Sequence, residues 1–327
     1  MSSARIAAVL LAALAVAMPT QGCSMPPKCF SKRPDHSFPK PELVRPNLTH
    51  GEAGRRLYDM VMDGDAEAVA ATLRADPVLA GLTVGYDRSG DRPEGQEGDL
   101  LTLAVTNCDP VMLATLLRSG VAPDGVERGR AMTYAMLADE PDMAEQLFQA
   151  GASPDPQKRG GQDLLTEVAA DRNLGAAMML VRHGLDLNWI DQFGRGHLES
   201  AVNMESFAVA EILVGAGAPL WRVSLGGFMP VHALFRPRIL ADPAADAAFE
   251  RLRQKARRPG LPWPPPPREE VLRRVLAGEW PTPAMRDAGM VASPAAIAML
   301  RQRARDYGET GGETGGETAG KTGSATP

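Results

Sequence analysis

Four glycines recur at nearly constant spacing along the middle of the chain. Gly120, Gly151, Gly184 and Gly217 follow one another at intervals of 31, 33 and 33 residues. A period near 33 with two helical segments in each unit is typical of a protein built from stacked repeats. Each unit of such an array buries its apolar face against its neighbours. The sequence therefore predicts an extended surface that holds a partner, rather than a cleft for chemistry.

The residues around these glycines follow one template. The segments 99–124, 130–155, 163–188 and 196–221 align on their glycines without internal gaps. Small residues in the first half of each unit allow two helices to approach closely, and large aliphatic residues in the second half fill the layer between them. The first column contains Leu101, Met132, Leu165 and Leu198, the second Ala104, Ala135, Val168 and Ala201, and the third Leu116, Leu147, Leu180 and Leu213.

Each unit is predicted to be a helix, a turn, a second helix and a loop. Asp109-Pro110 marks the turn in the first of them, because aspartate caps free N–H groups and proline is tolerated at the first helical position. The repeated glycine follows the second helix, where a left-handed residue closes the helix without a Cβ penalty.

Two flanking segments extend the pattern. Residues 55–76 fit the same columns with Leu57 in the first, and an insertion at 83–99 separates them from the next unit. Val231 lies 33 residues after Leu198 and begins a sixth unit, whose second helix is displaced by Pro237 and Pro243. We therefore predict an all-α solenoid of about five to six helix-turn-helix units over residues 51–237.

The units resemble ankyrin repeats, which contain a Thr-Pro-Leu-His element and end in Gly-Ala-Asp-Val-Asn. Met229-Pro230-Val231-His232 matches the first element, while residues 151–155 and 184–188 match the ending. The resemblance covers residues 51–236 and depends on the spacing, because the Thr-Pro-Leu-His element is nearly lost in the middle repeats. A tetratricopeptide or HEAT-type helical array is the alternative, and the chain's repeated ending does not support it.

The resemblance implies protein binding through hairpin tips and the concave face of the first helices. By position the tips are 125–129, 156–162, 189–195 and 222–227, and tryptophan and arginine are enriched at binding hot spots. An alternative is that the two tryptophans at the tips pack under neighbouring loops. Tyr134 and Glu167 are expected on the exposed part of the first helices. The predicted partner-binding residues are Trp189, Phe193, Trp221, Arg222 and Tyr134.

The first 22 residues resemble a secretion signal. Arg5 precedes an apolar run of 13 residues from Ile6 to Met18, too short to span a membrane. Gly22-Cys23 resembles a bacterial lipoprotein site, at which Cys23 would be lipidated after cleavage, and Ser24 resembles an outer-membrane address. Cleavage after Ala17 is the alternative. Localisation is thus expected to be exported and periplasmic, with a lipid anchor in the outer membrane.

The remaining cysteines are Cys29 and Cys108. If Cys23 is not acylated, Cys23 and Cys29 are able to form a small disulfide loop in an oxidising compartment. Cys108 occupies a turn column usually taken by glycine, and we expect it to be a small packing residue. Three cysteines do not make a disulfide framework.

The two ends differ in composition from the array. Residues 23–50 contain repeated prolines with Lys and Arg between them and predict an extended tether. Residues 238–306 predict a helical extension, with short helices near 268–278, 283–289 and 294–306, that caps the last repeat. Residues 307–327 repeat Gly-Glu-Thr and predict a disordered tail, because they lack large apolar side chains.

The composition argues against several other classes of function. The formal charge of −5 gives no global attraction to nucleic acid, and no His or Cys pair has metal-ligand spacing. No G-x-S-x-G, H-E-x-x-H or phosphate-loop motif occurs, so we expect no enzyme and no cofactor. His232 is expected to hydrogen-bond neighbouring loop backbone.

The sequence leaves two main hypotheses open. One is a cell-envelope scaffold that captures another protein, of which a toxin-immunity protein is a specific version. The other is a structural or stress-protection factor of the envelope that depends on the tail. A cryptic enzyme in 238–306 is a third option.

Overall fold

The chain is described by a computed structural model. It covers residues 47–85, 96–126, 128–138, 140–155, 164–191, 194–224, 226–237, 243–287, 290 and 294–310. The predicted all-α fold is confirmed, because helices dominate these residues. The signal-like segment, nearly all of the tether and the last 17 residues lie outside the described part of the chain.

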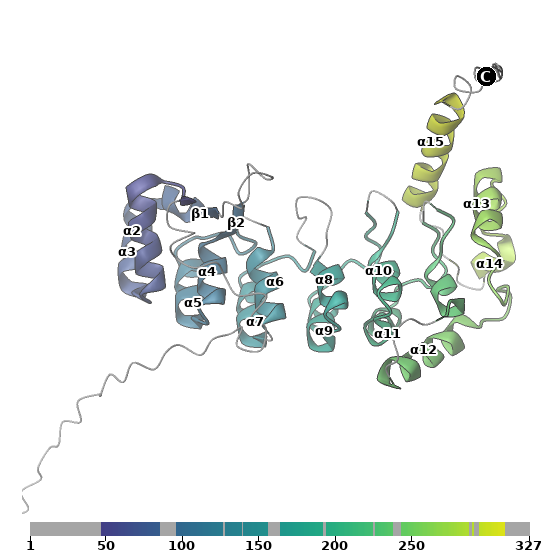
Figure 1. Cartoon of the computed structure of the whole chain (residues 1–327), viewed down its shortest axis with the longest axis horizontal. Helices are drawn as coiled ribbons and strands as arrows, with labels where there is room; N and C mark the ends of the chain where they lie inside the picture. Colours follow the sequence, from purple (N-terminus) through teal and green to yellow (C-terminus); the bar gives the residue numbers. More distant parts are fainter. Residues whose placement is uncertain are drawn as a thin grey trace, which may run out of the picture.

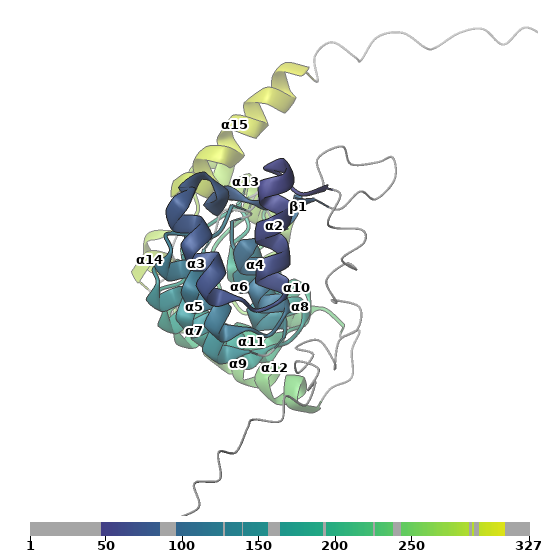
Figure 2. The ribbon, with the colours of Figure 1, turned by 90° about the vertical axis from the view of Figure 1, so that its left-hand side faces the viewer.

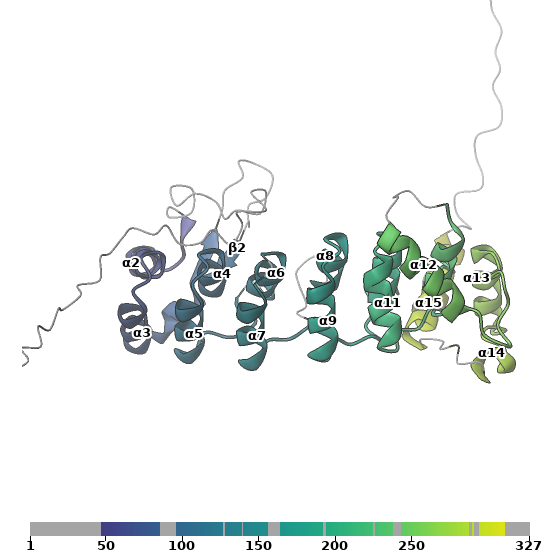
Figure 3. The same cartoon turned by 90° about the horizontal axis from the view of Figure 1, so that it is seen from below.

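Five helix pairs form two layers that run the length of the array. Figure 3 shows the first helices α2, α4, α6 and α8 in one row and the second helices α3, α5, α7 and α9 in the other. Figure 2 looks along the array, with α2 and α3 nearest the viewer. The pairs are α2 (Gly51–Met62) and α3 (Ala66–Ala75), α4 (Leu100–Thr106) and α5 (Pro110–Arg118), α6 (Arg130–Leu137) and α7 (Pro141–Gln149), α8 (Leu164–Ala170) and α9 (Leu174–Arg182), and α10 (His197–Asn203) and α11 (Phe207–Gly215).

The three apolar columns form the core between these layers. Every residue of the three columns is buried, with at most 2% of its surface exposed, and so are Leu57 and Val231. Neighbouring first helices pack on each other, as do most neighbouring second helices. A fully buried leucine contributes about 1.5–3 kcal/mol through the hydrophobic effect. No hairpin shields its own apolar side, so stability comes from stacking.

The turn chemistry matches the sequence. Asp109 accepts a hydrogen bond from the N–H of Met112 at 2.8 Å, and α5 begins at Pro110. Gly184, which closes α9, has a φ of +89°, and a Cβ there would meet no atom within 4 Å. Glycine is needed at this position for its left-handed backbone, not for space. The repeated glycines before and after it also have positive φ.

The insertion contains a short hairpin that the sequence did not predict. Strands β1 (Thr83–Gly85) and β2 (Gln96–Asp99) pair antiparallel, with Thr83 opposite Asp99. A 3₁₀ turn, η3 (Pro77–Gly81), leads into β1, and Leu48 forms an isolated bridge with Val84.

The sixth unit is irregular and closes the array. A 3₁₀ segment, η4 (Pro230–Phe235), replaces its first helix, and α12 (Pro243–Ala256) packs against α11 (Figure 1). The Phe207 and Phe249 rings meet edge to face at 4.9 Å. Arg251 donates to both carboxylate oxygens of Glu211, at 2.7–3.0 Å. α12 thus begins at the second of the two displacing prolines, Pro243, and lies against α11, the second helix of the last regular pair.

Three further helices follow the cap. They are α13 (Arg268–Ala277), α14 (Pro283–Asp287) and α15 (Pro294–Thr310), and α13 packs against α15. The last helix runs four residues further than the predicted end at 306, into the segment predicted as a disordered tail.

Candidate binding surfaces

A groove lies on the first-helix layer between two neighbouring repeats. It has a volume of about 390 Å³, and we call it the α6–α8 groove. Because its walls belong to successive hairpins, it exists only when the hairpins stack. Its lining residues are Arg130, Thr133, Tyr134, Leu137, Glu167, Ala170 and Asp171.

The α6–α8 groove combines an aromatic ring with charges of both signs. Tyr134 is half-buried, and the guanidinium of Arg130 lies 5.9 Å from its ring centroid. Glu167, also half-buried, faces it from α8. A tyrosine that is partly desolvated before binding supplies contact area at low entropic cost. The structure thus brings together the two first-helix residues that the sequence singled out.

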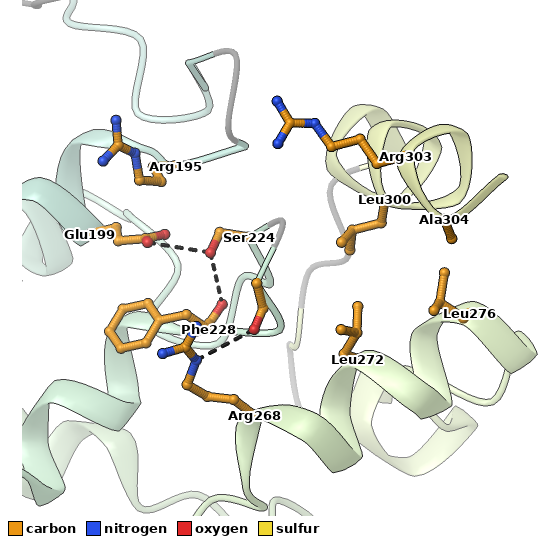
Figure 4. A pocket seen from close by; sticks show the side chains of 11 residues that line it. Arg195, Glu199, Ser224, Phe228, Arg268, Leu272, Leu276, Leu300, Arg303 and Ala304 are labelled. Carbon is orange, nitrogen blue, oxygen red and sulfur yellow. Dashed lines mark hydrogen bonds between the residues drawn. The ribbon is translucent and has the colours of Figure 1, made fainter. Parts of the chain in front are cut away.

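A second groove lies where the C-terminal helices meet the loop after α11. We call it the C-terminal groove, and it has a volume of about 500 Å³. Figure 4 shows leucines from α13 and α15 on one side, and Glu199 and Ser224 on the other. Its lining residues are Arg195, Glu199, Ser224, Gly226, Phe228, Arg268, Leu272, Leu276, Leu300, Arg303 and Ala304.

Glu199 is the buried acid of the C-terminal groove. Only 6% of its surface is exposed, and Ser224 Oγ donates to Glu199 Oε1 at 3.3 Å. Burial raises the pKa of Glu199 to about 7, against the lowering effects of Ser224, Arg195 and Arg222. At neutral pH this carboxyl is therefore near half-protonation, which is unusual for a glutamate.

The residue type at 199 is a signal that sequence reasoning missed. The corresponding positions of the three preceding units are Thr102, Thr133 and Thr166, directly after the first column. Thr102 and Thr133 are buried. An acid in a column of buried threonines marks a position where the environment differs, although nothing in the sequence places α13 and α15 beside it.

The predicted tip residues differ in how far they are buried. Trp189 is half-buried and stacks on His197, with ring centroids 4.8 Å apart. Phe193 lies outside the described residues. The expectation that Trp221 and Arg222 lie exposed at a tip is wrong, because 5% and 4% of their surfaces are exposed.

Trp221 and Arg222 both donate hydrogen bonds to backbone carbonyls inside the fold. Trp221 Nε1 donates to the carbonyl of Ala256 at the end of α12, at 3.3 Å. Arg222 Nη1 donates to the carbonyl of Leu187, also at 3.3 Å. A Cβ at Gly196 would lie 1.6 Å from Arg222 Nη2, so glycine there provides the room for this side chain. For Trp221 the alternative of packing inside the fold is correct.

His232 has the backbone role that the sequence predicted. Its Nδ1 accepts from the N–H of Met229 at 3.0 Å, and its Nε2 lies 2.8 Å from the carbonyl of Pro266. Since Nδ1 is the acceptor, Nε2 carries the proton and donates. Burial lowers the pKa of His232. The proline-rich segment before α13 is thereby fixed to the sixth unit.

Cys108 differs from the prediction. It has a φ of +56° at the turn between α4 and α5, and it is disulfide-bonded rather than a simple packing residue. The chain's other cysteines, Cys23 and Cys29, lie outside the described residues.

The described residues hold neither a metal-binding cluster nor a membrane-spanning helix. Among these, no group of three or more His, Cys, Asp or Glu side chains is placed to hold a metal ion. None of the helices in the same ranges has the length and apolar character needed to cross a membrane.

Comparisons with known proteins give a likeness among solved structures alone. No family model and no curated protein matches the sequence. Among solved structures, the chain is similar to the ankyrin repeat domain of Bcl-3, a member of the IkappaB family, with 21% identity and a TM-score of 0.44. The match covers 54% of this chain and 78% of that one. The all-α repeat fold is seen in the chain's own helix pairs and buried columns, and it does not depend on this likeness.

Proposed function

We propose that this chain is a protein-binding scaffold whose partner lies against the first-helix layer at the α6–α8 groove. The observation that supports this most is the lining of that groove, in which two repeats surround a half-buried tyrosine with Arg130 and Glu167. Tyrosine and arginine are enriched among the residues that dominate binding energy. On the second-helix layer, the exposed large apolar side chains of the described residues include Val111 of α5 and Leu174 and Met178 of α9.

Site-specific photo-crosslinking in cells tests this proposal. A photoreactive phenylalanine analogue replaces Tyr134 in one variant and Met178 in a control variant, since Met178 is 55% exposed on α9 in the other layer. We expect a discrete protein adduct from position 134 and none from position 178. Equal labelling from both positions, or adducts only from 178, would contradict a first-helix binding face.

We further propose that the scaffold is exported and held in the periplasm by a lipid on Cys23. Residues 1–22 have the pattern of a secretion signal, and the proline-rich tether separates Cys23 from the array. The disulfide at Cys108 supports this, because disulfides persist in oxidising compartments such as the periplasm. With Cys23 acylated, Cys29 is the cysteine left to pair with Cys108.

The mass of the mature amino terminus tests the anchor. We expect a diacyl- or triacyl-glyceryl group on Cys23 and, under non-reducing digestion, a peptide that links Cys29 to Cys108. A mature chain that begins at Met18 would refute lipidation and would leave a soluble exported protein.

A further inference from the structure

The C-terminal groove is a separate surface from the α6–α8 groove. Its walls come from three parts of the chain: the segment around Arg195 and Glu199, the loop from Ser224 to Phe228, and helices α13 and α15. The Arg268 Nε donates to the carbonyl of Gly226 at 3.4 Å and so joins α13 to that loop. Because α13 and α15 lie outside the repeats, this groove is a property of this chain and not of the repeat unit.

One side of the groove is apolar. Leu272 and Leu276 of α13 point toward Leu300 of α15 across it (Figure 4). Leu276 is 39% exposed, which is high for a leucine between two packed helices. Contact with an apolar side chain of a ligand would remove this surface from water, which favours binding.

The rim of the groove is positively charged. Three arginines line it, Arg195, Arg268 and Arg303, against one carboxyl group, that of Glu199. Arg195 pairs with Asp191 at 2.7 Å, whereas no described carboxylate lies within ion-pair distance of Arg268. The buried Arg222 acts on Glu199 by its charge, which lowers the pKa of that carboxyl against the effect of burial. Glu199, whose pKa burial raises to about 7, carries only part of its negative charge at neutral pH.

We infer that the C-terminal groove binds an acidic peptide segment of a partner protein. An apolar side chain of the segment lies against Leu276 and the exposed part of Leu272, beside the buried Leu300, and flanking carboxylates meet Arg268 and Arg303. Arginine matches carboxylates through paired N–H donors, which gives both charge attraction and geometric selectivity. The inference rests on the proposed function, because it takes the ligand to be part of a protein.

The observations favour a peptide over an anionic lipid or a free fatty acid. The arginines are distributed over three segments around the groove, as Figure 4 shows for Arg195, Arg268 and Arg303, rather than gathered at one end. Carboxylates on both sides of an apolar residue match this distribution. A single headgroup at the end of an alkyl chain does not.

Peptide selection on the full mature chain tests the inference. A random peptide library displayed on phage is selected against the protein, and the enriched peptides are synthesised and measured by fluorescence anisotropy. We expect enrichment of Asp and Glu beside Leu or Phe. In the double variant Arg268→Glu and Arg303→Glu, Kd is expected to rise at least about tenfold, because two attractive pairs become repulsive.

Matched variants separate charge from structure. Arg273→Glu reverses an arginine on α13 that does not line the groove and is 65% exposed, so it is expected to leave Kd unchanged. Leu276→Ser keeps every arginine and is expected to weaken binding through the apolar wall. Circular dichroism and thermal melting of each variant show whether it is folded.

Three results would overturn the inference: no enriched peptide, enriched peptides without acidic residues, or binding that the double variant keeps. Dodecanoate that binds the wild type while no peptide does would assign the groove to an anionic amphiphile instead. An adduct at position 134 together with any of these results would leave the scaffold proposal in place. Loss of that adduct with an intact peptide site would refute only the α6–α8 groove.

Discussion

Replacing Glu199 with glutamine removes a buried charge while keeping the size of the side chain. In the folded chain the pKa of Glu199 is about 7, whereas its ordinary value is 4.5. The folded state therefore holds this proton more tightly than the unfolded state does. The stability that the group contributes is fully present below its unfolded pKa and is lost as pH rises from 4.5 through 7.

The size of the effect follows from the two pKa values. The difference, 7 − 4.5 = 2.5, corresponds to about 3 kcal/mol, because each pKa unit is worth roughly 1.4 kcal/mol. The value of 7 already includes the attraction of Arg195 and Arg222, so these are not counted again. We expect Glu199→Gln to be close to neutral near pH 4.5 and to stabilise the chain by up to about 3 kcal/mol well above pH 7.

Urea unfolding of the full mature chain at about pH 5 and about pH 9 measures this difference. Glu67→Gln, a change of an exposed acid on α3, is the control and is expected to show no pH-dependent difference from the wild type. The reasoning fails if Glu199→Gln destabilises the chain at high pH, or if its effect is the same at both pH values.

Three further predictions concern the turns, the sixth unit and the disulfide. Gly184→Ala forces a side chain into left-handed backbone and is expected to lower the free energy of unfolding by about 1–2 kcal/mol, measured by thermal unfolding. The control Gly175→Ala, inside α9, is expected to raise the free energy of unfolding by about 0.5–1 kcal/mol. Burial lowers the pKa of His232, so its NMR titration midpoint is expected below 6.5. The stability that His232 contributes is therefore lost as pH falls through that midpoint. A midpoint above 6.5 would contradict its burial. Cys108→Ser removes the disulfide and is expected to cost about 2–4 kcal/mol in urea unfolding, and a variant as stable as the wild type would show that the bond constrains little.

The repeat array could be predicted because its determinants are local and periodic. The glycine spacing, the Asp109-Pro110 turn and the three columns each depend on residues within one hairpin and recur in the next. Tyr134 and Glu167 could be placed on the first helices for the same reason. Their meeting in one groove follows once adjacent repeats stack.

The features that the sequence missed depend on distant contacts. Trp221 donates a hydrogen bond to the carbonyl of Ala256, 35 positions later, and Glu199 lines a groove whose other wall is α13 and α15. Composition alone marked both tip residues, Trp221 and Arg222, as hot-spot types, but it contains no information on which segment covers them. The β1–β2 hairpin was missed because Gln96–Asp99 has no alternating apolar pattern.

Every binding surface proposed above depends on α4 to α11 being one stacked array with the apolar columns inside. Hydrogen–deuterium exchange of the full chain, measured by mass spectrometry for the wild type and for Leu147→Ala, tests this most directly. Leu147 is fully buried on α7, so the variant is expected to raise exchange in α7 and also in α6 and the preceding hairpin's α5, which pack on it, while α13 stays unchanged. Exchange that is unaffected, or that rises only within α7, would contradict an array in which neighbouring hairpins support one another.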